Sequence, residues 1–202
     1  GWRHFIGVAA APRENDMSFA GKTVMVTGGA GNLGRAVAEH FSGLGANLVL
    51  LDVTGRGDEK GLFIQTDLLD QKSVDAAVGQ AIARFGRIDV LANIAGGFRM
   101  GKPVHETTDE DWNFLFDLNV RTVLHTARAV VPRMLAAGGG KIVNIGAFSA
   151  QKGAAQMAAY TASKSAVIRL TEAMAAELRD KGINVNCVLP TVIDTPQNRA
   201  AM

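Results

Sequence analysis

The sequence predicts an α/β protein, a single domain with a doubly wound parallel sheet of the Rossmann type in three α/β/α layers. One observation behind this prediction is that short β-rich runs alternate with helical segments from Lys22 onwards. Another is that these runs are apolar throughout, which is typical of parallel strands covered by helices on both faces. Right-handed crossovers between such strands give the doubly wound arrangement.

The individual elements follow from local patterns. Strands are expected at residues 22–27, 47–52, 61–67, 87–95, 141–145 and 183–189. Helices are expected between them, at 35–44, 70–85, 109–137 and 157–181. Gly45 and Gly86 end the first two helices, and three glycines at 138–140 end the third. Pro132 predicts a kink in the third helix, because proline removes a backbone donor and clashes with the preceding turn.

Composition limits the class of protein. A chain of 202 residues, 48% hydrophobic and 20% charged, is long enough for one domain with a substantial core. The net charge of +2 predicts no nucleic-acid partner, and no apolar run reaches the roughly 18 residues of a membrane span. The single cysteine, Cys187, excludes an internal disulfide, and the four histidines lack metal-ligand spacing, so no metal is predicted.

The chain divides into two parts. Residues 1–17 do not fit the periodic pattern, and they are expected to form an irregular extension or to lie upstream of the true start at Met17. Their apolar stretch is short and no cationic cluster precedes it, so a secretory signal is not favoured and the expected location is the cytoplasm. Residues 18–202 are expected to form the domain, ending early, soon after the sixth strand.

The turn after the first strand reads Thr27-Gly-Gly-Ala-Gly-Asn-Leu-Gly34. Its Gly-x-Gly-x-x-Gly spacing lets the backbone approach a pyrophosphate, whose charge is favoured at the N-terminus of the following helix. The alternative is a tight strand-to-helix turn without a ligand. The residues that this turn offers to a dinucleotide are Gly28, Gly31, Asn32, Leu33 and Gly34.

The choice between the two nicotinamide dinucleotides depends on Asp52, which ends the second strand. A carboxylate at this position accepts hydrogen bonds from the adenosine ribose hydroxyls and repels a 2′-phosphate. NAD(H) is therefore the favoured cofactor. Arg56 lies close enough in sequence to offset that repulsion, so NADP(H) stays open.

A Tyr-x-x-x-Lys pair, Tyr160 and Lys164, lies far downstream of the glycine turn. Residues four apart share a helix face, so the two side chains are expected side by side. An ammonium beside a phenol stabilises the phenolate, which would lower the pKa of the tyrosine from about 10. Tyr160 would then exchange a proton with a substrate.

Together and in this order, these motifs resemble the short-chain dehydrogenase/reductase family, over residues 22 to 202. Asn93-Ile-Ala-Gly96 after the fourth strand and Asn119 fit the same pattern. The resemblance implies that Asn119 holds a water in a proton relay to Lys164, which also binds the nicotinamide ribose. It implies further cofactor contacts, besides those of Tyr160 and Lys164, from Asp67, Leu68, Asn93, Ala95, Gly96, Pro190, Val192 and Thr195.

The sequence also departs from the family pattern. Asn32, Ile94 and Thr191 replace residues that the family usually has as glycine, asparagine and glycine. Ala147 stands where the family's catalytic serine is expected, and alanine cannot donate a hydrogen bond to a substrate carbonyl. The loss of such a donor could cost about 3 kcal/mol of transition-state stabilisation. Ser149 is a candidate replacement, with an ordinary loop serine as the alternative.

One branch of the family, the dihydropteridine reductases, is similar in placing Gly146-Ala147 before the helix and dispensing with the serine. Ala95-Gly-Gly-Phe98 and residues 189–202 resemble that branch too, whereas the remaining sequence is more similar to the ketone-reducing members. In a pterin-type site, a flat conjugated substrate is oriented by its own hydrogen bonds.

The resemblance therefore implies an oxidoreductase that transfers hydride between NAD(H) and a small carbonyl, alcohol or conjugated C=N substrate. The alternative is a dinucleotide-binding relative whose catalysis is impaired by Ala147. The helices at 109–137 and 157–181 carry broad apolar, alanine-rich faces, which the family pairs with a symmetry mate as a four-helix contact. A homodimer or homotetramer is expected.

Overall fold

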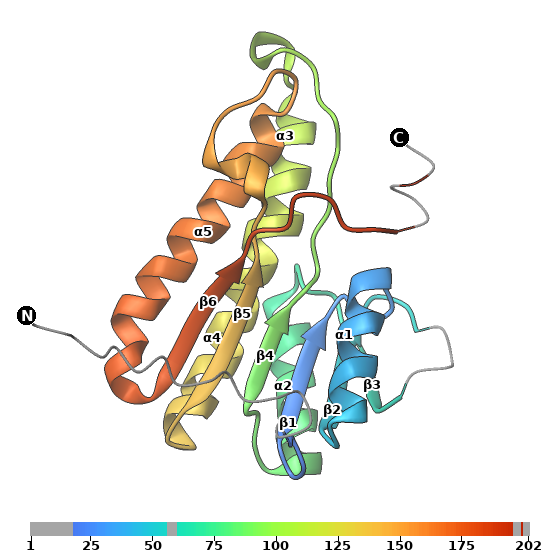
Figure 1. Cartoon of the computed structure of the whole chain (residues 1–202), viewed down its shortest axis with the longest axis vertical. Helices are drawn as coiled ribbons and strands as arrows, with labels where there is room; N and C mark the ends of the chain where they lie inside the picture. The colour runs from blue at the N-terminus through green and yellow to red at the C-terminus, as the bar shows by residue number, and fades with distance from the viewer. Residues whose placement is uncertain (1–17, 56–59, 196–198, 200–202) are drawn as a thin grey trace, which may run out of the picture.

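The computed structural model describes residues 18–55, 60–195 and 199. Six strands form one sheet in the order β3-β2-β1-β4-β5-β6, and every pairing is parallel (Figure 1). All the strands therefore end at the same edge of the sheet, and the doubly wound Rossmann-type prediction is confirmed. The strands are β1 (Thr23–Thr27), β2 (Asn47–Asp52), β3 (Leu62–Gln65), β4 (Val90–Asn93), β5 (Gly140–Ile145) and β6 (Ile183–Val188).

Helices pack on both faces of this sheet, and Figure 1 shows α1 in front of it and α2 and α4 behind. The helices are α1 (Asn32–Gly43), α2 (Gln71–Phe85), α3 (Asp109–Phe116), α4 (Thr122–Ala136) and α5 (Ala158–Leu178). Short turns join them: η2 (Val104–Glu106), the π-helical η3 (Asp117–Arg121), η4 (Phe148–Gln151) and η5 (Arg179–Lys181).

Two apolar cores hold the layers together, because successive side chains of a strand point to opposite faces. Val24 and Val26 of β1 pack with Ala38 of α1 on one face. Met25, between them, belongs to the core on the other face, where α2, α4 and α5 contribute buried residues such as Val130. The residue pattern of the central strands thus fixes which helices each face receives.

The edge strand β6 is less covered than the centre. β1 and β4 are buried at every residue. Along β6, buried and exposed residues alternate, and Asn184 and Asn186 are exposed. The expectation that the strands are apolar and covered on both faces is wrong for β6. Alternation of this kind is what a strand with one covered face shows.

The expected helix at 109–137 is continuous but not uniform. α3, η3 and α4 follow one another without a break, and in η3 the N–H of Thr122 bonds to the carbonyl of Asp117, five residues back. Such π turns are frequent at functional sites, and Asn119 lies in this one. Pro132 lies inside α4, and the helix continues past it to Ala136.

Other bounds differ only slightly from those expected. α1 begins at Asn32 rather than at residue 35, and β4 spans Val90–Asn93 rather than 87–95. The expected extension at 1–17, Arg56, and most of the segment after Thr195 lie outside the described residues.

Candidate active site

The site lies where the strand order reverses, between β1 and β4. β2 and β3 lie on one side of this pair and β5 and β6 on the other, so the loops that leave β1 and β4 diverge at the carboxyl edge. Open α/β sheets bind ligands in the crevice formed there. The hydroxyl of Thr27 links the two loops by accepting the N–H groups of Ile94 (3.0 Å) and Ala95 (3.1 Å).

In the glycine turn after β1, backbone atoms lie so close together that some positions leave no room for a side chain. Gly28 has φ of +66°, and a Cβ on Gly34 would lie 2.0 Å from the carbonyl oxygen of Gly28. Gly31 precedes α1, and neither a capping side chain nor an acidic residue occupies the first turn of the helix. A closely approachable turn and an uncapped helix N-terminus fit the pyrophosphate of a dinucleotide, and Asn32, Leu33 and Gly34 form that first turn.

Asp52 stands beside this turn at the end of β2. Its Oδ2 accepts the N–H of Ala30 (3.0 Å), and its Oδ1 accepts the N–H of Val53 (2.8 Å). Backbone donors therefore hold the half-buried carboxylate at the edge of the turn. Its remaining lone pairs suit the hydroxyl donors of a ribose.

Asp67 and Leu68 lie further along the same edge, after the edge strand β3. The carboxylate of the exposed Asp67 accepts the N–H of Leu69 (2.8 Å). Leu68 is buried, and its carbonyl bonds to Nδ1 of His125 (2.9 Å). The structure thus places both residues apart from those that surround Tyr160.

A cleft of about 550 Å³ opens over the ends of β4, β5 and β6. Its walls come from the start of α1, the loops after these strands, and the start of α5, segments that lie far apart in the sequence. The structure thus brings together the larger part of the residues expected around the reacting atoms. They are Leu33, Gly96, Ala147, Ser149, Tyr160, Lys164, Pro190 and Val192.

Asn93 lies beneath this cleft and is buried. Its Nδ2 donates to Oδ1 of Asn144 (2.8 Å), and its Oδ1 accepts the hydroxyl of Thr126 (2.9 Å). Asn144 in turn donates to the hydroxyl of Thr171 (2.9 Å). Because these bonds engage the side chain with the protein, Asn93 is a brace between β4, β5, α4 and α5, and its expected contact with a cofactor stays a prediction that would fall to its backbone.

Ala95 and Gly96 follow β4 and lie close to the glycine turn and to Lys164. A Cβ on Gly28 would lie 3.0 Å from backbone atoms of Ala95, so the two loops are in close contact. A Cβ on Gly96 would lie 2.9 Å from Oδ1 of Asn119 and 3.2 Å from Nζ of Lys164. A side chain at position 96 would therefore displace the two polar groups that lie against it.

Lys164 and Tyr160 lie one turn apart on α5, and both line the cleft. Lys164 is buried, and its Nζ donates to the carbonyl of Ile145 at the end of β5 (2.9 Å). Loss of hydration lowers the pKa of this ammonium to about 8, and the nearby Cys187 opposes the shift. The phenol of Tyr160 makes no hydrogen bond within the described residues, so it is free to meet a substrate.

Burial raises the pKa of the Tyr160 phenol above its usual value. The expected lowering by Lys164 is therefore contradicted in this structure, because desolvation of the phenol outweighs any attraction from the ammonium. The physical consequence is a phenol that stays protonated at neutral pH. Such a group is suited to donating a proton.

Asn119 makes three hydrogen bonds within the protein, and its expected part in a water relay stays a prediction. Its side chain is buried; Oδ1 accepts the N–H of Gly97 (2.9 Å), and Nδ2 donates to the carbonyl of Gly97 (3.1 Å) and to Oγ of Ser163 (3.0 Å). Both amide protons are thus used within the protein, whereas Oδ1 accepts one N–H and keeps a second lone pair for a water. What the structure shows is a clamp on the backbone of Gly97.

The two positions considered for a hydroxyl donor both line the cleft. Ala147 is buried, and its methyl group leaves that part of the wall apolar. Ser149 lies one residue into η4, and its hydroxyl makes no hydrogen bond within the described residues. The structure therefore leaves Ser149 able to take the donor role.

The segment after β6 closes one side of the cleft. Pro190 and Val192 line it, and the carbonyl of Pro190 accepts the N–H of Phe148 (3.0 Å), which ties this segment to η4. Thr195 lies beyond the lining residues; its carbonyl accepts the N–H of Arg199 (2.9 Å).

Further residues complete the lining of the cleft, and only some of them had been named from the sequence. The segments that contain Ile94, Gly97, Phe98, Gly146 and Thr191 were named there, whereas Ile145, Met157 and Ile193 were missed. Nearly all of these lining residues lie at or after the end of a strand, so their positions at the common carboxyl edge would have identified them. Met157, which precedes α5, had no such signal.

The profile of the family described as short chain dehydrogenase matches residues 22–202. The chain belongs to this family. Sorbitol dehydrogenase of Cereibacter sphaeroides is 37% identical to it over 187 residues, 88% of this chain and 73% of that protein. D-threitol dehydrogenase of Mycolicibacterium smegmatis is 36% identical over 191 residues, 89% and 73% of the two proteins.

A solved structure supports the same family assignment. NAD+-bound xylitol dehydrogenase superposes with a TM-score of 0.84 at 31% identity, over 89% of this chain and 74% of that one. As a short-chain dehydrogenase, the protein is an NAD(P)-dependent oxidoreductase acting on small molecules. None of these three relatives is a dihydropteridine reductase, so the local resemblance to that branch stays a hypothesis.

The described residues contain neither a candidate metal site nor a helix that could span a membrane. No group of three or more His, Cys, Asp or Glu side chains there could hold a metal ion. No helix among them is both long and apolar enough to cross a membrane.

The lowered pKa of Lys164 predicts how stability depends on pH. Between about 8, the pKa in the folded protein, and about 10.4 in the unfolded chain, the unfolded chain binds more protons. The free energy of unfolding therefore gains about 2–3 kcal/mol across this window relative to Lys164→Met, which lacks the titrating group. Urea unfolding at several pH values measures the difference. The matched control is Lys152→Met at an exposed site. Parallel pH curves for wild type and Lys164→Met would contradict the assignment.

Proposed function

We propose that the protein is an NAD(H)-dependent oxidoreductase that interconverts a small alcohol and its carbonyl compound, with Tyr160 as the acid/base. The observation that carries this proposal is the free phenol of Tyr160, one helical turn from the buried Lys164, in a cleft that adjoins the glycine turn. A conjugated C=N compound is the second substrate class that such a site would accept.

The residues that would hold the cofactor follow the carboxyl edge of the sheet. In this proposal Gly28, Gly31 and the first turn of α1, Asn32 to Gly34, bind the pyrophosphate. Asp52 binds the adenosine ribose, and Asp67 and Leu68 lie at the adenine. Ala95 and Gly96 form the floor, Lys164 binds the nicotinamide ribose, and the carboxamide is bound by Pro190, Val192 and Thr195.

When bound, the nicotinamide supplies or accepts a hydride, that is, two electrons and a proton. Tyr160 balances this transfer. In reduction the phenol donates its proton to the carbonyl oxygen while carbon receives the hydride; in oxidation the phenolate takes the hydroxyl proton as the C–H bond breaks. Because burial raises the pKa of Tyr160, reduction is favoured at neutral pH and oxidation at higher pH.

Asn119 supports this chemistry in two ways in our proposal. Its side chain holds Gly97, and its Oδ1 and the Nζ of Lys164 lie against the same glycine, Gly96. In this proposal Oδ1 of Asn119 also holds the water of a proton relay that ends at Lys164, because its amide protons are already bonded within the protein.

The competing function is cofactor binding with impaired catalysis. Ala147 favours it, because an alanine at this position stabilises no developing oxyanion. Ser149, which lines the same cleft, favours an active enzyme. The two functions differ in turnover and not in cofactor affinity.

The assembly in our proposal is a homodimer or homotetramer formed through α4 and α5. An apolar groove of about 320 Å³ runs between these helices, lined by residues such as Leu124, Leu170 and Met174. Leu124 is 37% exposed, so the groove leaves apolar surface for a second copy to cover.

Cofactor preference tests the role of Asp52. NADH should bind at least about tenfold more tightly than NADPH, a difference of roughly 1.4 kcal/mol. Asp52→Ala should narrow this gap, because it removes both the ribose acceptor and the charge that repels a 2′-phosphate. Fluorescence titration measures both affinities, and equal affinities in the wild type would overturn the assignment.

The mechanism is tested by removing the phenol oxygen. Tyr160→Phe should abolish turnover and leave NADH affinity nearly unchanged, since only the hydroxyl is lost. Lys164→Ala should weaken both, because that residue also binds the ribose. NADH consumption on a panel of diketones, quinones and a quinonoid dihydropterin gives the readout. Full activity of Tyr160→Phe on the best substrate would refute the mechanism.

Two further variants separate the competing functions in the same assay. Ser149→Ala should lower kcat about a hundredfold if Ser149 supplies the donor. Ala147→Ser should raise activity on simple ketones if the donor is missing, and should do little in a pterin-type site. NADH binding without turnover in the wild type on every substrate would support the impaired relative.

Assembly is tested by light scattering at micromolar concentration. The wild type should be at least dimeric, and Leu124→Glu should shift it towards the monomer by placing a charge in the α4–α5 groove. Leu135→Glu, on the same helix, 40% exposed and outside the groove, is the matched control and should not dissociate it. A monomeric wild type would contradict the proposal.

A further inference from the structure

Phe98 is a large apolar side chain that does not pack in either apolar core. It lines the cleft, yet it is 54% exposed. Its ring stands edge-on to the ring of Tyr160, with the ring centroids 4.9 Å apart and the planes at 86°. A half-exposed aromatic ring therefore stands beside the ring of the acid/base, in the wall of the cleft.

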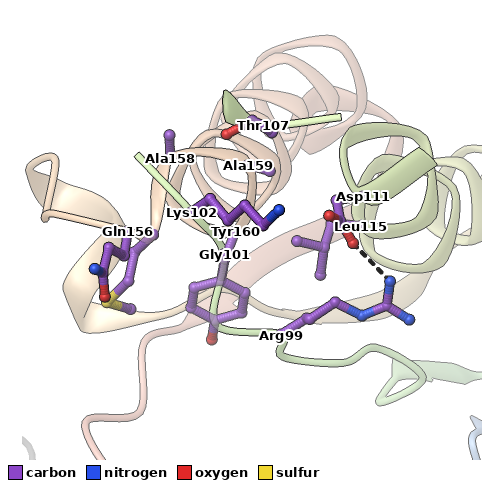
Figure 2. A pocket seen from close by; sticks show the side chains of 11 residues that line it. Arg99, Gly101, Lys102, Thr107, Asp111, Leu115, Gln156, Ala158, Ala159 and Tyr160 are labelled. Atoms are coloured by element: carbon purple, nitrogen blue, oxygen red, sulfur yellow. Dashed lines mark hydrogen bonds and ion pairs between the residues drawn. The ribbon is translucent and has the colours of Figure 1, made fainter. Parts of the chain in front are cut away.

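The segment that carries Phe98 is fixed on both sides. On the preceding side, Asn119 binds both the N–H and the carbonyl of Gly97. On the following side, Nη1 of Arg99 bonds to Oδ1 of Asp111 (2.8 Å), and its guanidinium lies 4.0 Å from the ring centroid of Phe114. Arg99 is thus anchored to α3 by an ion pair and a cation–π contact, and Figure 2 shows it reaching towards Asp111 near Tyr160.

A third tie joins this segment to the start of α5. The N–H of Gly101 donates to the carbonyl of Gln156 (2.8 Å). Gln156 has φ of +61°, a left-handed conformation that is costly for a residue other than glycine and is found preferentially at functional sites. The next residue, Met157, lines the cleft as Phe98 does. The two apolar side chains are therefore presented by segments that hold each other in place.

The cleft around Phe98 is poor in hydrogen-bonding side chains. Those that line it are Ser149, Tyr160, Lys164 and Thr191, and Lys164 is already bonded to the carbonyl of Ile145. The wall position that Ala147 occupies offers a methyl group. A polyol would lose hydrogen bonds to water on entering this cleft, because few side chains there replace them. A flat apolar ring would instead cover Phe98 and Met157.

We propose that Phe98 determines substrate specificity by stacking against the ring of an aromatic or alicyclic secondary alcohol, and that Arg99 is the residue that positions it. This inference rests on the proposed function, which supplies the two-electron oxidation of the alcohol to its ketone. It implies that the polyols for which the relatives are named are poor substrates of this protein.

The test compares kcat and KM for NAD+-dependent oxidation of 1-indanol, 2-butanol and xylitol. The wild type should have a kcat/KM for 1-indanol at least tenfold above that for xylitol. Phe98→Leu should lower kcat/KM for 1-indanol at least fivefold, mainly through KM, and change that for 2-butanol less than twofold. Arg99→Met should give the same KM effect in weaker form, because Phe98 remains but is no longer held.

The matched control is Phe148→Leu, since Phe148 is equally exposed, at 54%, but does not line the cleft; its kinetics should be unchanged. A wild type that prefers xylitol, or that oxidises none of the three alcohols, would overturn the inference, as would a Phe98→Leu variant that loses activity equally on all of them. The Tyr160→Phe variant distinguishes a failure of the specificity inference from a failure of the proposed function. If it is inactive while Phe98→Leu leaves selectivity unchanged, the specificity inference fails alone; if it is active, the proposed function fails.

Discussion

The buried hydrogen bonds among Thr126, Asn93, Asn144 and Thr171 are the interaction on which the rest of the site depends. They join β4 and β5 to α4 and α5 directly beneath the cleft. Buried polar groups are costly unless they are paired, so the native arrangement of these four elements is the one that satisfies all four side chains.

The geometry of the reactive residues follows from this brace. Ile145 is next to Asn144 in β5, and its carbonyl receives the ammonium of Lys164 from α5. The same helix carries Tyr160 one turn earlier, and the π turn before α4 carries Asn119, which holds Gly97. A shift of α5 against β5 would therefore separate Lys164 from its carbonyl and misplace Tyr160.

Burial decides the protonation of this site more than proximity does. Desolvation lowers the pKa of Lys164 and raises that of Tyr160, so each group is moved towards its neutral form. A neutral phenol can donate a proton, and in our proposal the apolar wall formed by Ala147 and Phe98 disfavours a strongly hydrated substrate. Family membership fixes the class of reaction, whereas these wall residues bear on the choice of substrate.

The sequence by itself determined the sheet, the strand order class and the glycine turn, because each depends on local chemistry. β1 is buried throughout and the Gly34 position excludes a Cβ, and both constraints are readable from neighbouring residues. The pairing of Tyr160 with Lys164 on one helix face is local in the same way. The alternating exposure of β6 was missed because it depends on what covers an edge strand.

Only the tertiary structure decided what the polar side chains do. Asn119 is bonded to residues 22 and 44 positions away, and Asn93 to a residue 51 positions away, so their partners could not be read from spacing. The direction of the pKa shift of Tyr160 required its burial, and the importance of Phe98 required its contact with that ring. Desolvation and side-chain contact are properties of the folded surroundings, which depend on segments that are distant in the sequence.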